Sequence, residues 1–435
     1  MAAMNPRVSL SQAAWTWLRI GLLSFGGPAG QIAVMHRIVV EEKRWVSEER
    51  FLRALNCCTL LPGPEAQQLV TWLGWSQHGM LGGLVSGGLF VLPGALVMLG
   101  LSAAYAAWHT VPVMSGVFFG INAAVVALVA EALIRISRRA LIGHTARLLA
   151  VASFLAIFLL NVPFPAVVLG AGLIGARWPE RVARPGSSDP EQRDARWPSL
   201  RRTLGVLAVG LILWWAPLGL LAGILGREHL FTQLGLFFSQ AAVVTFGGAY
   251  AVLAYMAQHV VQDMGWISAG AMVDGLGLAE TTPGPLILVV QFVAFNAAFQ
   301  HPGPLGPWGA GLLGSAVALW VTFAPSFLWI FLGAPVVDAI AQVKRLQGAL
   351  GAITAAVVGV IASLSLWFTL HVVFRELAPV ELLGRALTRP VWSSVDPLAV
   401  AGVVLALLFT FRWHVGLAWL LGGAALLGAL SGVLG

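Results

Sequence analysis

The polar residues with the clearest chemical potential lie beside two short Pro-Gly-Pro segments. Glu65 directly follows Pro62-Gly63-Pro64, and Glu280 lies shortly before Pro283-Gly284-Pro285. A helix that starts after such a break presents free backbone N–H groups and roughly half a positive charge from its dipole. Helix starts of this kind bind oxyanions without the help of a lysine. The two segments therefore predict anion sites with carboxylates nearby.

Two glycine pairs carry the same kind of interruption. Ser24 precedes Phe25-Gly26-Gly27, and Thr245 precedes Phe246-Gly247-Gly248. Because glycine and proline are unfavourable inside helices, we expect broken backbone at all four places. Two facing turns lined by the glycine breaks would form a small cage of amide donors, to which nearby hydroxyls add. The predicted substrate-binding and translocation residues are Ser24, Gly26, Gly27, Pro62, Gly63, Pro64, Glu65, Gln67, Thr245, Gly247, Gly248, Thr281, Thr282, Pro283, Gly284 and Pro285.

Ionisable residues in apolar segments are costly, so each one invites a functional explanation. Glu65, Glu280 and Asp274 are the candidates for gating the path or coupling transport to protons. A carboxylate at a helix start is also a common cap, which is the structural alternative for Glu65. The structural alternative for the breaks themselves is that glycine and proline are commoner in membrane helices than in soluble ones. Two breaks in each half of the chain favour the functional explanation.

The composition places the whole chain in a membrane. Apolar residues make up 58% and charged residues 10% of the chain, and the mean hydropathy is +0.86. A soluble domain carries about 25% charged residues. Uncharged runs such as Met80–Val113 and Val415–Gly435 are long enough to span hydrocarbon. The predicted fold class is an all-α polytopic membrane protein, with the lipid bilayer as its surroundings.

The net charge of +7 does not indicate nucleic-acid binding, because the basic residues lie between the apolar runs, as loop charges do. Cys57 and Cys58 are adjacent in an apolar segment, where we expect packing residues rather than a disulfide. No Cys/His spacing suits zinc. We therefore expect no metal and no cofactor.

The breaks belong to an internal repeat. At an offset of 221 residues, 13 of the 40 positions from Phe25 to Pro64 are identical to those from Phe246 to Pro285. At an offset of 232, Ile121–Glu131 matches Ile353–Ser363 at six of 11 positions. The predicted division is a first repeat at 1–176, an arginine-rich cytoplasmic linker at 177–202 and a second repeat at 203–435.

The basic residues indicate that the two repeats are inverted. The loop after the first glycine break holds five lysines and arginines between residues 37 and 53, whereas its counterpart, 258–274, holds none. Cytoplasmic loops keep positive residues and exported loops lose them. Equivalent loops are therefore predicted on opposite sides of the membrane, as in transporters built from inverted repeats.

Counting the membrane crossings between two basic loops predicts that the Pro-Gly-Pro segments are re-entrant. The basic loops at 37–53 and 135–147 should share one side, and two full-length spans lie between them, at Gly82–Trp108 and Pro112–Ile134. Phe51–Leu61 and Glu65–Gln77 then remain as two short arms of a hairpin that enters and leaves on one side. The equivalent arms of the second repeat are Ala271–Thr282 and Leu286–Ala298. Leu204–Leu225, interrupted by Pro217, crosses once or dips and returns, so we expect ten to thirteen membrane segments.

These residues carry a resemblance to a known family. The chain resembles the chromate ion transporter family, in its long two-domain form, over nearly all of its length outside the linker. The resemblance rests on Phe25-Gly26-Gly27-Pro28, Arg44-Trp45-Val46, the run from Leu60 to Gln68, Thr245-Phe246-Gly247-Gly248, Gly265-Trp266 and Thr281-Thr282-Pro283-Gly284-Pro285. It implies a bacterial inner-membrane protein that exports chromate and confers resistance to it. It also implies halves that arose by duplication and oppose each other.

Two other functions stay open. Chromate resembles sulfate in shape and charge, so a proton-coupled importer of sulfate or a related oxyanion is the main alternative. A membrane enzyme is disfavoured, because the chain has no Gly-x-Ser-x-Gly elbow and no His-x-x-x-His pair. It also lacks the Gly-x4-Gly-Lys-Ser/Thr loop of an ATP-driven pump. The oligomeric state is not given by the sequence, and a homodimer is left open.

Overall fold

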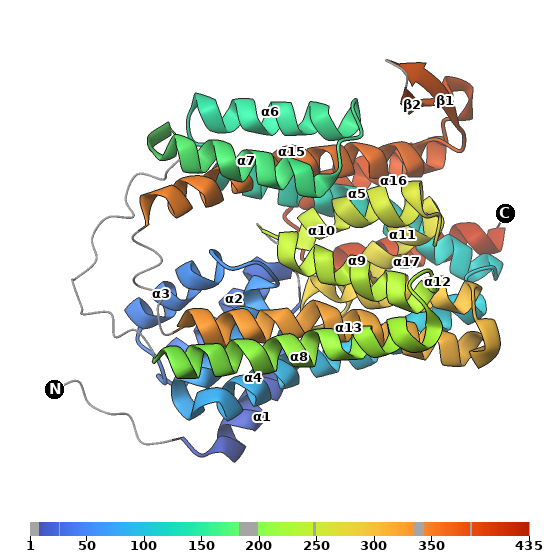
Figure 1. The fold of residues 1–435 in the computed structure, drawn as a ribbon. Helices are drawn as coiled ribbons and strands as arrows, with labels where there is room; N and C mark the ends of the chain where they lie inside the picture. The colour runs from blue at the N-terminus through green and yellow to red at the C-terminus, as the bar shows by residue number, and fades with distance from the viewer. Residues whose placement is uncertain are drawn as a thin grey trace. The chain divides into compact units, whose positions relative to one another are not determined.

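The computed structural model describes residues 8–25, 27–181, 199–246, 249–334, 343–382 and 385–434. Helices make up nearly all of its regular structure, and an antiparallel hairpin supplies the two strands (Figure 1). This confirms the all-α membrane class. Five helices in the described part are long and apolar enough to cross a membrane: α4 (Glu65–Trp108), α5 (Pro112–Ala140), α8 (Leu200–Leu225), α13 with its preceding turn (Gly303–Gly333) and α15 (Lys344–Val373).

The order of elements repeats along the chain. The first series is α1 (Leu10–Leu23), α2 (Gly27–His36), a π-helix (Arg37–Glu42), α3 (Glu48–Cys58), α4, α5, α6 (His144–Phe158) and α7 (Phe164–Arg177). The second is α9 (Leu230–Val244), α10 (Ala249–Met256), a π-helix (Ala257–Asp263), α11 (Ala269–Thr281), α12 (Val289–Gln300), α13 (Gly306–Gly333), α15, α16 (Pro397–Phe411) and α17 (Leu417–Leu434). π-Helices are rare, so their recurrence at one offset extends the sequence repeat to local structure.

The predicted re-entrant arms are present as short helices. In the first repeat they are α3 and the start of α4, which is kinked at His78 (φ −132°) and Gly79 (φ 63°), directly after the predicted arm end at Gln77. In the second repeat they are α11 and α12, the latter preceded by a 3₁₀ turn at Leu286–Leu288. Helix α8 is continuous through Pro217 and is long and apolar enough to cross a membrane once.

Local sequence explains why α3 starts where it does. Ser47 caps the helix by accepting a hydrogen bond from the Arg50 N–H group, and Glu48 and Glu49 place negative charge at the positive end of the dipole. Phe51, Ala54 and Cys58 form its buried face. Both cysteines are free and buried, which confirms their predicted role as packing residues.

The chain forms two compact units that cut across the repeats. Unit 1 comprises the described residues within 1–103, 186–252 and 282–343, and unit 2 those within 104–185, 253–281 and 344–435. Each unit therefore contains elements of both repeats. The division into repeats and linker remains a prediction, and most of the linker, 182–198, lies outside the described residues.

Unit 1 is organised around α13. This helix packs against α8, α9 and α12, and α4, α8 and α13 run side by side in Figure 1. A buried apolar cluster joins α1, the first π-helix, α3 and the start of α4, with Trp17, Ile38, Phe51 and Leu69 among its members. The first π-helix and the short arms of the first repeat are thus held by close packing rather than by their own length.

Unit 2 shows a reciprocal exchange between the repeats. The long helix of the second repeat, α15, packs on α6 and α7 of the first, while α5 of the first repeat packs on α16 and α17 of the second. Glycines allow the backbones to meet: a Cβ on Gly428 of α17 would lie 2.1 Å from Gly116 O of α5. Likewise, a Cβ on Gly348 of α15 would lie 2.4 Å from Gly175 O of α7. Reciprocal contacts of this kind are produced by a two-fold relation between copies.

The second repeat carries an insertion between α15 and α16. Its strands, β1 (Leu377–Leu382) and β2 (Arg385–Pro390), form the antiparallel hairpin. From α6 to α16 the offset is 253 residues (144 + 253 = 397), whereas the preceding offset was 232, so the insertion adds 21 residues. After it, α7 and α17 keep the offset of 253 (164 + 253 = 417).

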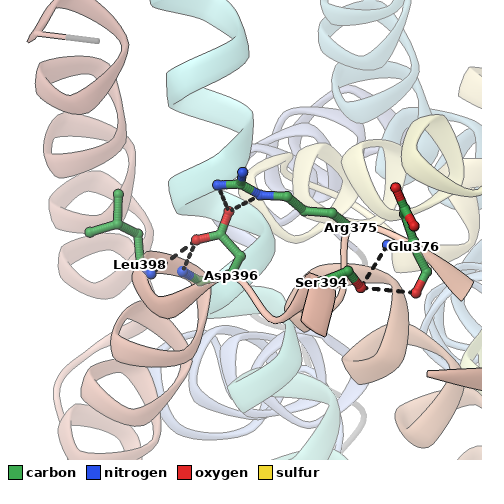
Figure 2. A network of polar contacts seen from close by, with 6 residues as sticks. Arg375, Glu376, Ser394, Asp396 and Leu398 are labelled. Carbon is green, nitrogen blue, oxygen red and sulfur yellow. Dashed lines mark hydrogen bonds and ion pairs between the residues drawn. The ribbon is translucent and has the colours of Figure 1, made fainter. Parts of the chain in front are cut away.

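Asp396 lies where the chain passes from this insertion into α16, and it caps the start of that helix (Figure 2). One carboxylate oxygen accepts hydrogen bonds from Arg375 Nε and Nη2, at 2.9 and 2.8 Å. The other accepts from the N–H groups of Leu398 and Ala399, at 3.0 and 3.3 Å. Burial raises the pKa of Asp396, but the bonds from Arg375 and the two amides outweigh it and hold the pKa below its usual value.

We predict that Ser47→Cys and Ser268→Cys, each in a background of Cys57→Ala and Cys58→Ala, label from opposite sides of the membrane. The two serines are repeat equivalents (47 + 221 = 268), and both are exposed in the structure. An impermeant maleimide applied to right-side-out and inside-out vesicles measures the sidedness. Labelling of both from one face would exclude an inverted arrangement, because the reciprocal contacts alone also fit a two-fold axis along the membrane normal.

We predict that Asp396→Ala weakens amide protection in the first turn of α16. Loss of an N-cap costs about 1 kcal/mol, or roughly fivefold in local opening. Because the folded pKa is lowered, the stabilisation is present above about pH 4 and is lost as pH falls through the folded pKa. Hydrogen exchange of Leu398 and Ala399 in detergent measures it. Equal protection in the variant and the parent at pH 7 would contradict the capping role.

Candidate functional site

The two Pro-Gly-Pro turns are each held by the residue before the other repeat's glycine break. We call residues 62–64 turn 1 and residues 283–285 turn 2. The N–H group of Gly63 in turn 1 donates to Thr245 O at 2.9 Å, and the N–H group of Gly284 in turn 2 donates to Ser24 O at 2.8 Å. Gly63 and Gly284 are equivalent (63 + 221 = 284), as are Ser24 and Thr245 (24 + 221 = 245). All four residues lie in unit 1.

Glutamines satisfy the carbonyl groups of the same turns. Gln68 Nε2 donates to Pro62 O at 2.7 Å in turn 1, and Gln31 Nε2 donates to Gly284 O at 2.7 Å in turn 2. Both glutamines are buried. Non-helical backbone at membrane depth is tolerated only where protein or water meets its polar groups, and here side chains and backbone of unit 1 supply the partners.

Because the turn glycines already donate their N–H groups, an anion beside turn 1 meets the positive end of the α4 dipole instead. Gln68 is the first residue of α4 whose N–H bonds backwards, to Pro64 O at 2.9 Å. The amides just before it have no intrahelical acceptor. In the second repeat, Leu288 N bonds to Pro285 O at 3.0 Å, so the helix opens with a tighter 3₁₀ turn. The two turns thus share their anchoring bonds but differ in their helix starts.

A small cavity lies beside turn 1. Gly63, Pro64, Thr245 and Thr322 contribute to its wall, and the remaining lining residues are apolar. No charged side chain lines it. The space holds about one water molecule, so a tetrahedral oxyanion enters only if the wall of the cavity rearranges.

Two residues that the sequence analysis missed face turn 1 from α13. The hydroxyls of Thr322 and Ser326 have no hydrogen-bond partner among the described residues, and the two side chains are 3% and 1% exposed. Thr322 lines the cavity, and a Cβ on Gly63 would lie 2.6 Å from Ser326 Oγ. Their position around Pro325 was available in the sequence, but their approach to turn 1 is a tertiary contact.

The predicted hydroxyl residues have mixed roles. Thr245 Oγ1 donates to Ala241 O, and Thr281 Oγ1 donates to Leu278 O at 2.7 Å, so both hydroxyls serve their own helices. Thr282 is buried. Ser24 Oγ is fully buried with no hydrogen-bond partner in the described part of the chain. Of the predicted hydroxyls, Ser24 is the one that retains free donor capacity.

The candidate carboxylates occupy three different settings. Glu65 is the first residue of α4 and is partly buried, and Glu280 is 4% exposed in the last turn of α11. Asp274, also on α11, accepts hydrogen bonds from Tyr105 Oη at 2.9 Å and Asn122 Nδ2 at 2.8 Å, all within unit 2. Among the described residues, neither lysine nor arginine pairs with Asp274.

The structure describes Gln67 and Gly27 among the other predicted positions, and some predicted glycines lie outside the described residues. Gln67 is fully buried, and its Nε2 donates to Thr71 Oγ1 at 3.0 Å. Gly27 begins α2 with φ 73°, a backbone conformation that favours glycine. Gly26, Gly247 and Gly248 lie outside the described residues. The search of the described residues finds no cluster of His, Cys, Asp and Glu suited to a metal ion.

Sequence comparison agrees with this duplicated arrangement. The profile of the Chromate transporter family matches residues 11–176 and 232–429, which together are most of the chain. The chain belongs to the chromate transporter family. The two matched segments coincide with the two series of elements, α1 to α7 and α9 to α17. None of the solved protein structures matches this member of the family.

Curated relatives cover most of this chromate transporter family member. A protein named "Chromate transport protein" from Pseudomonas aeruginosa is 33% identical over 369 residues, covering 83% of this chain and 81% of the relative. A protein of the same name from Cupriavidus metallidurans is 27% identical over 409 residues, covering 92% and 93%. A "Probable chromate transport protein" from Synechococcus elongatus is 29% identical over 369 residues, covering 82% and 84%.

We predict that Gly63→Ala impairs chromate transport far more than Gly284→Ala does. Both glycines have positive φ, 122° and 84°, so both variants carry backbone strain. Only at Gly63 does the added Cβ also collide, at 2.6 Å with Ser326 Oγ and 2.8 Å with Gln68 Nε2, whereas at Gly284 the nearest atom is 3.4 Å away. Rotation of Gln68 away from the new methyl group breaks its hydrogen bond to Pro62 O, a loss of about 1 kcal/mol or roughly fivefold.

Chromate uptake by inside-out vesicles, normalised to the amount of inserted protein, compares the two variants. Gly284→Ala is the matched control for the strain that both substitutions share. Equal rates in the two variants would show that contacts at turn 1 do not limit transport. A lower rate in Gly284→Ala than in Gly63→Ala would place the critical contacts at turn 2.

Proposed function

We propose that this protein exports chromate across the bacterial inner membrane and thereby confers resistance to it. The observation that carries the proposal is the match along most of the chain to proteins named as chromate transport proteins. The membrane setting is supported by the long apolar helices. Each turn is anchored beside the other repeat's glycine break, and it is at these turns that we propose the anion binds.

The neutral character of the site suits a transported anion. The cavity wall at turn 1 carries no charged side chain, and the Thr322 hydroxyl on that wall has no hydrogen-bond partner among the described residues. Helix starts stabilise anions through partial charge. A transporter must release its substrate as well as bind it, and partial charges hold a dianion less tightly than a buried ion pair with arginine would.

Export is the direction that the membrane potential favours. A dianion leaving a cell that is negative inside gains about 2.3 kcal/mol per charge per 100 mV, or about 4.6 kcal/mol in total. Each 1.4 kcal/mol corresponds to about tenfold in concentration. Export therefore proceeds against a concentration ratio of over about a thousandfold without ATP. Uptake of the same anion needs several coupled cations.

The second candidate function is proton-coupled import of sulfate or a related oxyanion. One observation favours it: Asp274 is a partly buried carboxylate held by two neutral donors, Tyr105 and Asn122. Carboxylates inside membrane segments commonly form proton relays. Glu65 and Glu280 are further candidates for this coupling, and Glu131 is not, because it pairs with Arg135 at 3.8 Å.

We predict robust chromate uptake into inside-out vesicles at zero pH gradient when the vesicle interior is positive. That polarity draws the dianion in the direction that is outward in the cell, so the rate should rise with the imposed potential. Radiolabelled chromate and sulfate are compared while the potential and the pH gradient are set separately. Absence of potential-driven chromate uptake, with transport appearing only under a pH gradient, would favour the importer.

Three variants, Glu65→Gln, Glu280→Gln and Asp274→Asn, sharpen the distinction. In an exporter driven by potential alone, each slows transport at most and leaves the charge moved per turnover unchanged. In a proton-coupled importer, the critical variant loses its dependence on the pH gradient but still exchanges substrate. Vesicles containing Glu131→Gln, whose parent carboxylate forms the surface pair with Arg135, provide the control for loss of one negative charge.

A further inference from the structure

The hydroxyls of Thr322 and Ser326 differ from most other hydroxyls on the helices of this protein. Serine and threonine inside helices commonly donate to a carbonyl one turn back. Thr16, Ser102, Thr354 and Thr369 do so here, each to the residue four positions earlier. Thr322 and Ser326 do not, although both are more than nine-tenths buried. Their hydrogen-bonding capacity remains available for another group.

Both hydroxyls lie on the face of α13 that contacts turn 1. Residues four apart lie on the same face of a helix, and on α13 that face meets turn 1. Thr322 lines the small cavity together with Gly63 and Pro64, and Ser326 Oγ is 2.6 Å from where a Cβ of Gly63 would lie. The start of α4, with the positive end of its helix dipole, follows Pro64 directly. Turn 1 therefore brings together two hydroxyl donors and a helix start.

The repeat provides an internal comparison. At the offset of 232, Thr322 corresponds to Phe90 and Ser326 to Gly94, both on α4. These residues pack against turn 2 as their counterparts pack against turn 1: Phe90 O and Gly94 Cα are the backbone atoms nearest to a Cβ of Gly284. A Cβ on Gly94 would lie 2.1 Å from Pro283 O, so α4 and turn 2 meet backbone to backbone. Turn 2 has neither the hydroxyl pair nor space for one.

We propose that the transported oxyanion binds asymmetrically, at turn 1, where the Thr322 and Ser326 hydroxyls donate to its oxygens beside the start of α4. Turn 2 serves as the structural counterpart that anchors the break in the first repeat. The proposal rests on the proposed function for its substrate class, a tetrahedral oxyanion. It identifies two residues of the second repeat as binding residues for a site whose backbone belongs to the first.

Because the cavity is small, binding of the anion requires a conformational change. Space for about one water molecule does not hold a tetrahedral oxyanion. The anion therefore enters when the face of α13 that bears Thr322 and Ser326 separates from turn 1, and its oxygens then replace the contact between them.

The test measures KM and kcat for chromate in inside-out vesicles containing Ser326→Ala, Thr322→Val or both. A hydrogen bond to a charged group contributes on the order of ten- to a hundredfold in affinity. Each single variant should raise KM by about tenfold or more, with a larger increase in the double variant. The conservative variants Ser326→Thr and Thr322→Ser keep a hydroxyl and should recover much of the affinity.

Ser102→Ala and Thr354→Val are matched controls, because their hydroxyls bond to their own helices. They should leave KM unchanged. If Ser326→Ala and Thr322→Val match them while the parent transports chromate, the asymmetric site is wrong. If Ser24→Ala, which removes the unpaired hydroxyl beside turn 2, raises KM as much as Ser326→Ala does, the site is symmetric instead.

The outcomes also separate this inference from the proposed function. If the parent protein moves neither chromate nor sulfate under any imposed gradient, the proposed function fails. If the parent transports either oxyanion and the hydroxyl variants change only kcat, with the same loss in the controls, the hydroxyls are structural and the inference alone fails. A shift in KM that is reversed by the conservative variants supports both.

Discussion

The structure of unit 1 depends on the need to satisfy buried backbone at the two Pro-Gly-Pro turns. Gly63 and Gly284 lie where neither helix nor bulk water meets their N–H groups, and each donates instead to a carbonyl just before the other repeat's glycine break. The acceptors, at Thr245 and Ser24, are free to accept because the helices α9 and α1 end there. Each interruption thus provides the partner that another interruption requires.

This reciprocal dependence explains why the repeats are interleaved rather than folded as separate domains. A single repeat would leave its turn amide and its helix-end carbonyl unpaired, and each buried unpaired group costs about 1–3 kcal/mol. The same exchange is seen in unit 2, where α6 and α7 pack on α15 while α16 and α17 pack on α5. Glycines at these crossings permit the close backbone approach that membrane helices use for association.

The two turns share the same backbone hydrogen bonds but are faced by different side chains. The anchoring bonds involve backbone atoms, so they persist whatever side chains the two repeats carry. Side chains facing the turns are under no such constraint, and they differ: Thr322 and Ser326 at turn 1, Phe90 and Gly94 at turn 2. The carboxylates differ as well, since Asp274 occupies the position equivalent to Arg53 (53 + 221 = 274). One repeat-derived framework therefore presents two chemically distinct faces.

The sequence by itself determined the membrane class, the internal repeat, the glycine and proline interruptions of the helices and the family. Each of these depends on local composition or on short motifs in a fixed order. It also located the re-entrant arms to within a few residues, since proline and glycine interrupt a helix wherever they fall. Only the tertiary structure decided that the turn glycine amides are already engaged and that Thr322 and Ser326 face turn 1. Those facts depend on contacts between residues more than 180 positions apart, and no local propensity encodes which carbonyl or hydroxyl a distant helix will bring to a buried turn.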